Sequence, residues 1–285
     1  MSSELALRIA ECMGAHVAQS RPLSGGCVAS VYRMDLDDGR SVVVKHDGGE
    51  SPRLDVEGYM LAYLAGHSAL PVPAVLHHAP DLLIMAYVPG ESAFSAAAEE
   101  DAARHLAALH GMQAAQHGLE RPTLIGGLHQ PNTPHDSWIA FFRQERLLYM
   151  AEECLRARRM SPEVCRRIER FAAGLDRLLT EPPYPSLLHG DVWTTNVLAQ
   201  GGRITGFIDP AIYYGHPEIE LAFITLFSTF SPAFFAAYGA IRPIAPGFFE
   251  VRRDIYNLYP LLVHTRLFGS HYLQGVDRTL RRWDY

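Results

Sequence analysis

Three polar side chains near residue 200 have the types and spacing needed for phosphoryl transfer. Asp191, Asn196 and Asp209 lie on two short apolar runs, and a Gln-Gly-Gly-Arg turn at residues 200–203 separates these runs. The pattern predicts a β-hairpin that gathers the three side chains at one end. Asp191 could then face a hydroxyl nucleophile, while Asn196 and Asp209 hold Mg²⁺ against nucleotide phosphates. A lone His-Gly-Asp is usually only a turn, but the added Asn and Asp favour a kinase-like site.

Lys45 is the candidate phosphate-binding cation. It is the only lysine in the chain. All the others among the 25 lysine and arginine residues are arginines. It follows the strand-like run Val42-Val43-Val44, and the planar fork of arginine cannot replace a compact ammonium group between phosphate oxygens. Apolar spacing predicts a helix over residues 53–65, and Glu57 on that helix is the expected partner that orients Lys45.

A small loop containing Gly25 and Gly26 precedes a hairpin predicted over residues 31–45. Glycines allow backbone N–H groups to approach phosphates closely, so both are candidate nucleotide contacts, although a plain turn is the alternative. Cys27 lies in the same loop, and a thiol beside backbone donors could be a redox switch.

The run Leu82-Leu83-Ile84-Met85 predicts a buried strand, and residues 86–90 predict a hinge between two lobes. Backbone groups at such a hinge can bind the adenine edge in a crevice between domains. The residues expected there are Met85, Tyr87 and Val88.

Helical patterns dominate the remaining chain. Helices are expected over residues 4–18, 99–117 and 136–158, and a further one begins at Ser161-Pro162, where serine caps and proline takes the first position. Another begins at Pro217, only eight residues beyond Asp209. This distance leaves no room for a long segment that docks an extended peptide, and it favours a small-molecule kinase.

Bulk properties exclude other classes of function. The chain has 285 residues, a net charge of −6 and 48% hydrophobic residues, which suits a two-lobed soluble protein and disfavours nucleic acid or anionic membranes as partners. No apolar run reaches the roughly 18 residues that span a bilayer, and no leader is visible, so the cytoplasm is expected. The 4 cysteines show no metal-binding spacing and are expected to be free, buried thiols.

The motifs together resemble the fructosamine (ketosamine) kinases, within the larger group of aminoglycoside-phosphotransferase-like and protein-kinase-like proteins. The resemblance covers essentially the whole chain. Its motifs are Gly25-Gly26-Cys27, Lys45 with Glu57, Trp138-x-x-Phe141 to Arg146-Leu147, His189-Gly190-Asp191 with Trp193 and Asn196, Asp209-Pro210-Ala211, Tyr214-Gly215-His216 and His264-x-x-x-Phe268-Gly269. Two positions depart from the family: Glu220 stands where Asp is usual, and Thr194-Thr195 replaces the commoner Ser-Gly or Pro-Gly.

The resemblance implies an α+β, two-lobed protein-kinase-like fold, with a β-rich nucleotide-binding lobe over residues 1–88 and a helical catalytic lobe over residues 89–285. It also implies ATP and Mg²⁺ as cofactors and phosphorylation of the sugar 3-hydroxyl of a small-molecule or protein-bound ketosamine, in deglycation. Asp191 would be catalytic, Asn196 and Asp209 would bind the metal, and Lys45 would bind phosphate.

Three residues are candidates for substrate contact. Trp193 would offer an apolar face to the sugar, or else lie in the core, while His216 and His264 are either pocket or structural residues. Two other functions stay open. The chain could be an aminoglycoside- or choline-type kinase of the same fold, or a catalytically dead nucleotide-binding protein.

Overall fold

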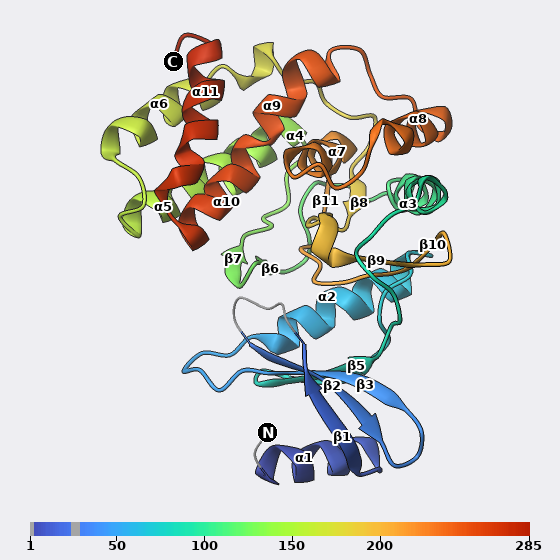
Figure 1. The fold of residues 1–285 in the computed structure, drawn as a ribbon. Coiled ribbons are helices and arrows are strands. Elements are labelled where there is room, and N and C mark those ends of the chain that lie inside the picture. Colours follow the sequence, from blue (N-terminus) through green and yellow to red (C-terminus); the bar gives the residue numbers. More distant parts are fainter. Residues whose placement is uncertain (1–2, 24–28) are drawn as a thin grey trace.

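The computed structural model describes residues 3–23 and 29–285, and it divides into a small sheet-based lobe and a larger helical lobe (Figure 1). The strands of the first lobe are β1 (Val17–Pro22), β2 (Ser30–Leu36), β3 (Ser41–His46), β4 (Val75–Ala79) and β5 (Leu82–Ala86). They form one antiparallel sheet in the order β1-β2-β3-β5-β4. The α+β, two-lobed fold expected from the sequence is confirmed.

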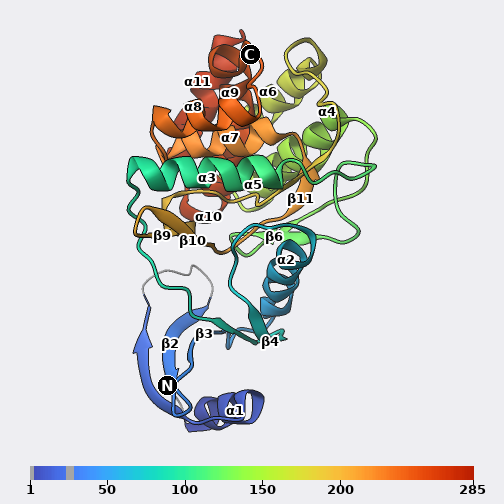
Figure 2. The same cartoon turned by 90° about the vertical axis from the view of Figure 1, so that its right-hand side faces the viewer.

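The two faces of this sheet are covered by different helices. Alternation along β3 places Val42 and Val44 under α1 (Ser3–Met13), in a core with Leu5 and Ile9. Val43 and Lys45 therefore face the other side, where α2 (Leu54–His67) packs through Leu54 and Leu61. Figure 2 shows α2 between the sheet and the helical lobe, whereas α1 lies on the far side. This arrangement directs Lys45 toward the interface between the lobes.

The helical lobe has one large core, to which α2 also contributes Met60 and Leu64. Its α-helices are α3 (Ala96–Leu109), α4 (Trp138–Phe141), α5 (Tyr149–Arg156), α6 (Pro162–Ala172), α7 (Pro217–Leu226), α8 (Pro232–Ile241), α9 (Arg253–Tyr256), α10 (Leu258–Phe268) and α11 (Leu273–Arg282). Short strands complete the lobe: β6 (Thr123–Ile125), β7 (Leu128–Gln130), β8 (Ser186–Leu188), β9 (Val197–Gln200), β10 (Arg203–Phe207) and β11 (Tyr213–Gly215).

The helix starts predicted at Pro162 and Pro217 are both confirmed by their caps. Ser161 accepts a hydrogen bond from the backbone of Val164, and Pro162 opens α6.

The helix expected over residues 136–158 is observed as α4, a π-helical turn over Phe142–Leu148 and α5 in succession. The helix expected over residues 4–18 is too long, because the chain turns at Gly14 (φ 64°) and Val17 begins strand β1. The helix expected over residues 99–117 ends at Leu109.

The predicted hairpin near residue 200 is present, but its first strand begins at Val197 and does not include the apolar run at Leu187. Strands β9 and β10 pair in antiparallel fashion around the turn at residues 201–202. Leu187 and Leu188 do not extend this hairpin. They belong to β8, which pairs with β11 instead. Asp191 therefore lies in a loop that connects two separate small sheets.

None of the helices in the described ranges is long and apolar enough to cross a membrane. Of the three cysteines in these ranges, Cys154 and Cys165 are buried free thiols, as expected. Cys12 is exposed, which corrects the expectation for that residue.

Candidate active site

Lys45 lies at the interface between the lobes. Its Nζ donates hydrogen bonds to Glu57 Oε1 at 2.7 Å and to Asp209 Oδ1 at 2.6 Å. The lysine is 8% exposed, so burial opposes its charged form, but the two carboxylates outweigh this and raise the pKa of Lys45. The predicted pairing with Glu57 is present, and the same ammonium group also reaches the carboxylate expected to bind metal.

Asp209 is held in a backbone conformation that is unusual for a residue with a side chain. Its φ is 52°, in the left-handed region that favours glycine, and such positions cost on the order of 1–3 kcal/mol. Two backbone hydrogen bonds support it: Ile208 N–H donates to Asn196 O at 2.9 Å, and Ala211 N–H donates to His189 O at 2.7 Å. These bonds join the loop that carries Asp209 to the loop that carries Asp191.

The side chain of Asn196 connects to Asp191 directly. Its Nδ2 donates to the carbonyl oxygen of Asp191 at 3.0 Å and to Asp191 Oδ2 at 2.9 Å. Burial and the Asp209 carboxylate raise the pKa of Asp191 to about 8, against the opposing effect of the Asn196 amide. The three residues predicted from their spacing, Asp191, Asn196 and Asp209, are thus brought together.

Asp191 is also fixed through the residue before it. Gly190 has φ 85°, and a side chain at this position would overlap the carbonyl group of Ala211. Its N–H donates to Glu220 Oε1 on α7 at 2.6 Å. A carboxylate acceptor strengthens this bond relative to a neutral one, so the peptide next to Asp191 is firmly placed.

The donors at this site fit a magnesium ion that arrives with a nucleotide. Because the Asn196 Nδ2 faces Asp191, its amide oxygen is turned away from that residue, and the Asp209 side chain remains 38% exposed. Among the described residues, no group of three or more His, Cys, Asp or Glu could hold a metal alone. Mg²⁺ commonly takes one or two carboxylate or amide ligands and completes its shell with water and phosphate, so the donor set is appropriate.

A cavity of about 30 Å³ lies beside Asp191. Its wall is largely aromatic and aliphatic, and it is formed by Ile125, Gly190, Asp191, Tyr213, Ile219, Glu220, Phe223, Tyr259, Pro260, Val263 and His264. Asp191 and Glu220 are the carboxylates of this lining, and both oxygens of Glu220 are engaged: one by Gly190 N–H and the other by His110 at 2.8 Å. Asp191 is therefore the carboxylate that remains available to a bound molecule.

Trp193 and His264 lie near the same loop. The ring of Trp193 is half-buried and packs against Phe227 at 5.8 Å between centroids, and Phe227 in turn contacts His264 at 4.8 Å. His264 Nδ1 lies 2.8 Å from the carbonyl oxygen of Pro260, which fixes this nitrogen as the donor and leaves Nε2 as an acceptor. Burial lowers the pKa of His264, which favours the neutral ring.

His216 has a structural role in this fold. It caps α7, since its Nδ1 accepts the backbone N–H of Glu218 at 3.1 Å, and its ring packs on Trp138 and Tyr256. Burial lowers the pKa of His216 to about 3, so the ring is neutral. His216 is not among the described residues that line the cavity. Its contacts therefore favour a structural role over a role in the substrate pocket.

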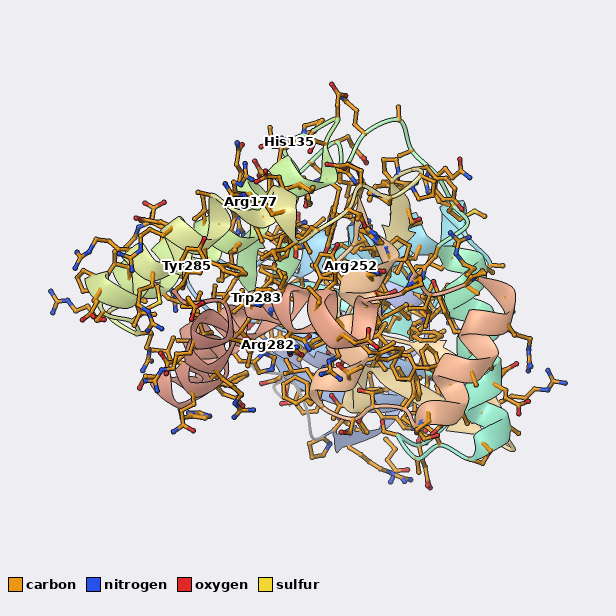
Figure 3. All side chains as sticks on the ribbon, turned by 90° about the horizontal axis from the view of Figure 1, so that it is seen from above. His135, Arg177, Arg252, Arg282, Trp283 and Tyr285 are labelled. Atoms are coloured by element: carbon orange, nitrogen blue, oxygen red, sulfur yellow. The ribbon has the colours of Figure 1, made fainter. Side chains whose placement is uncertain are left out.

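The helix that His216 caps is anchored by a buried ion pair. Glu218 accepts two hydrogen bonds from Arg252, at 2.6 and 2.7 Å. Figure 3 looks onto the helical lobe from above and labels Arg252. This pair holds α7, and with it Glu220, in place behind Asp191.

The predicted hinge follows β5 directly. Met85 is buried in the sheet core, Tyr87 N–H donates to Ser41 O at 3.1 Å, and Val88 packs against the backbone of Gly206. Beyond them, Glu91 and Ala199 exchange two backbone hydrogen bonds of 2.9 Å, which attach the hinge to β9. The predicted phosphate contacts Gly25 and Gly26, and Cys27 beside them, lie outside the described residues.

Sequence reasoning missed several residues of the site. Tyr213, Phe223 and Ile125 line the cavity, yet they come from three different elements, β11, α7 and β6, and carry no local motif. His110 was also missed, although it is fully buried and bonded to Glu220. His110 directly follows the apolar run Leu106–Leu109 at the end of α3, and a polar residue in that place was the available signal.

The fold and this site define a kinase-like phosphotransferase. A similar fold occurs in an aminoglycoside phosphotransferase solved with AMP-PNP and hygromycin B, with a TM-score of 0.69, 18% identity and 99% of each chain covered. At this low identity the likeness concerns the fold alone.

The chain belongs to the fructosamine kinase family, because the family model described as "Fructosamine kinase" matches residues 1–283. A "probable ketoamine kinase" of Vibrio parahaemolyticus is 32% identical over 267 residues, covering 91% of this chain and 90% of the relative. One of Synechocystis is 31% identical, covering 93% and 90%. A Thermobifida fusca crystal structure, titled "putative fructosamine-3-kinase", matches with TM-score 0.88 and 31% identity, covering 99% and 98%. The predicted family, kinase-like fold and phosphotransferase activity are thereby confirmed.

Proposed function

We propose that the protein transfers the γ-phosphoryl group of ATP, bound with Mg²⁺, to the sugar 3-hydroxyl of a ketosamine. A ketosamine is the rearranged adduct of a sugar with an amine, either free or on a protein side chain. A phosphate at carbon 3 leaves more readily than a hydroxyl, so the product can break down and release the amine. The physiological role would be deglycation in the cytoplasm.

The observation that carries the proposal is the convergence of Lys45, Asp209, Asn196 and Asp191 at the interface between the lobes. Residues 1–88 would bind the nucleotide, with Lys45 on its phosphates and Met85, Tyr87 and Val88 beside the adenine. Residues 89–285 would bind the acceptor.

Each polar residue then has a definite task. Asn196 and Asp209 would hold Mg²⁺, which when bound neutralises charge on the phosphate oxygens. Asp191 would orient the acceptor hydroxyl and take its proton, a role that suits a carboxyl group with a pKa near neutrality. Lys45, held by Glu57, would keep the phosphates in line with that hydroxyl.

The side chains around Asp191 support a ketosamine rather than an aminoglycoside as the acceptor. An aminoglycoside carries several positive charges and needs an acidic cleft. The cavity lining is largely aromatic and aliphatic, and the Glu220 carboxylate is already bonded on both oxygens. Trp193 and His264 would instead offer an apolar face and a hydrogen-bond acceptor to a single sugar ring.

A panel of acceptors tests this function. ADP release is measured with fructoselysine, ribuloselysine, choline and kanamycin, and Asp191→Asn serves as the control that should lose about 10²- to 10⁴-fold in rate. Turnover with the two ketosamines is expected. Turnover only with choline or kanamycin, or nucleotide binding without ADP release on any acceptor, would overturn the proposal.

A further inference from the structure

A chain of buried polar groups lies directly behind the loop that carries Asp191. Glu220 on α7 and His110 at the end of α3 are both completely buried, and His110 Nε2 lies 2.8 Å from Glu220 Oε2. The other ring nitrogen, Nδ1, lies 2.7 Å from the hydroxyl of Tyr238 on α8. Buried polar groups persist only when they are satisfied, so this chain has a definite arrangement of protons.

The proton positions follow from Glu220. Burial opposes the charged form of this carboxyl group, but its hydrogen bonds with His110 and Gly190 outweigh burial and lower the pKa of Glu220. The ionised carboxylate can only accept, so His110 Nε2 carries the ring proton that points at Glu220. His110 Nδ1 is then the acceptor for the hydroxyl of Tyr238.

The inner end of the chain fixes the peptide that precedes Asp191. Glu220 Oε2 receives the His110 proton, while Glu220 Oε1 accepts the N–H of Gly190 at 2.6 Å. Without His110, the buried Glu220 carboxylate would keep only one of these two hydrogen bonds, and it would rotate or draw in water. Either change would move Gly190, and an error of about 1 Å in a reacting group can cost about 10²-fold in rate.

We propose that His110 is a positioning residue for phosphoryl transfer: it holds the Glu220 carboxylate on the Gly190 amide and thereby sets the place of Asp191. Tyr238 supports it by selecting the Nε2–H tautomer. This role rests on the proposed function of Asp191 as the residue that faces the acceptor hydroxyl.

The test compares His110→Ala with His110→Gln and His117→Ala. His117 is a second buried histidine of the helical lobe, packed on Trp138 and Phe141, so its loss reports the cost of any buried ring. For His110→Ala we expect kcat to fall about 10- to 100-fold while the Kd of a fluorescent ATP analogue changes less than about twofold. His110→Gln should recover most of kcat, since its amide can donate to Glu220. His117→Ala should have the kcat of the wild-type protein when both are assayed at a temperature well below the Tm of the variant.

An NMR measurement separates this role from the proposed activity. The amide proton of Gly190, which donates to a carboxylate, should resonate far downfield in the wild-type protein, move upfield in His110→Ala and return in His110→Gln. If the wild-type protein phosphorylates no ketosamine, the proposed function fails, while the Gly190 resonance still decides the positioning role. An unmoved Gly190 resonance, or a kcat of His110→Ala within twofold of wild type, would overturn it.

Discussion

Lys45 Nζ and Asp209 Oδ1 lie 2.6 Å apart, although 164 positions of the chain separate them. The lysine comes from the central strand of the first lobe, and the aspartate follows the last strand of the hairpin in the second. This bond brings the proposed phosphate-binding cation to the proposed metal ligand. The active site therefore depends on how the two lobes are positioned relative to each other.

Replacing Lys45 tests whether a compact ammonium group is required. The site encloses Nζ between Glu57 and Asp209, and the wider guanidinium of Lys45→Arg cannot occupy the same place without moving them. We expect kcat/KM for ATP to fall on the order of 10²-fold or more. Steady-state assays with saturating acceptor measure this, and an arginine variant within threefold of wild type would contradict the assigned role.

Gly190 has a matched control in Gly201. Both have positive φ, 85° and 60°, but an added side chain would overlap the Ala211 carbonyl at residue 190 and would meet nothing within 4 Å at residue 201. Gly190→Ala should therefore lower the free energy of unfolding by more than about 2 kcal/mol, and Gly201→Ala by about 1 kcal/mol. Denaturant unfolding of both variants gives the comparison, and equal losses would show that the loop at residue 190 is not tightly packed.

Asp191 should make the metal-free protein less stable as the pH rises. In the folded chain it keeps its proton up to about pH 8, whereas an unfolded aspartate loses it near ~4. The folded state thus binds more protons between these values, and stability falls with pH across the window. Asp191→Asn cannot ionise, so its Tm advantage over wild type should grow from pH 5 to pH 9. A constant difference would mean that the pKa of Asp191 is not raised.

His216 should contribute in the opposite direction. Its pKa is about 3 in the folded chain and about 6.5 when unfolded, so the unfolded state binds more protons between these values and stability is lost as the pH falls through them. His216→Asn keeps a capping group and should reduce the loss of Tm between pH 6.5 and pH 4. His216→Ala removes the cap of α7 and should cost about 1 kcal/mol at pH 7.5. Identical acid sensitivity in wild type and His216→Asn would refute this.

Local patterns predicted those parts of the site whose signals lie close together in the chain. The run Val42-Val43-Val44 predicted the strand that carries Lys45, and the apolar spacing over residues 53–65 predicted the helix that carries its partner Glu57. The turn at residues 200–203 likewise predicted the pairing of β9 with β10. The start of α6 was readable from its serine cap and following proline.

The parts that were missed depend on distant pairing. Leu188 pairs with Tyr213 rather than within the hairpin, and nothing near Leu188 distinguishes these two partners. Val17 follows a helix-like spacing but joins the sheet, because its partner Leu36 is provided by another strand. His110 and Glu220 are 110 positions apart, so neither residue signals the bond alone. Tertiary packing decided each of these cases.

The position of the phosphate on the product tests the central proposal most directly. The protein is incubated with Mg²⁺, ATP and fructoselysine, and the product is examined by ³¹P–¹H correlation NMR, with the 3-deoxy analogue of the acceptor as control. We expect the phosphorus to couple to the proton on carbon 3, and the 3-deoxy analogue to remain unphosphorylated. Coupling to another carbon, or equal phosphorylation of the 3-deoxy analogue, would contradict the proposal.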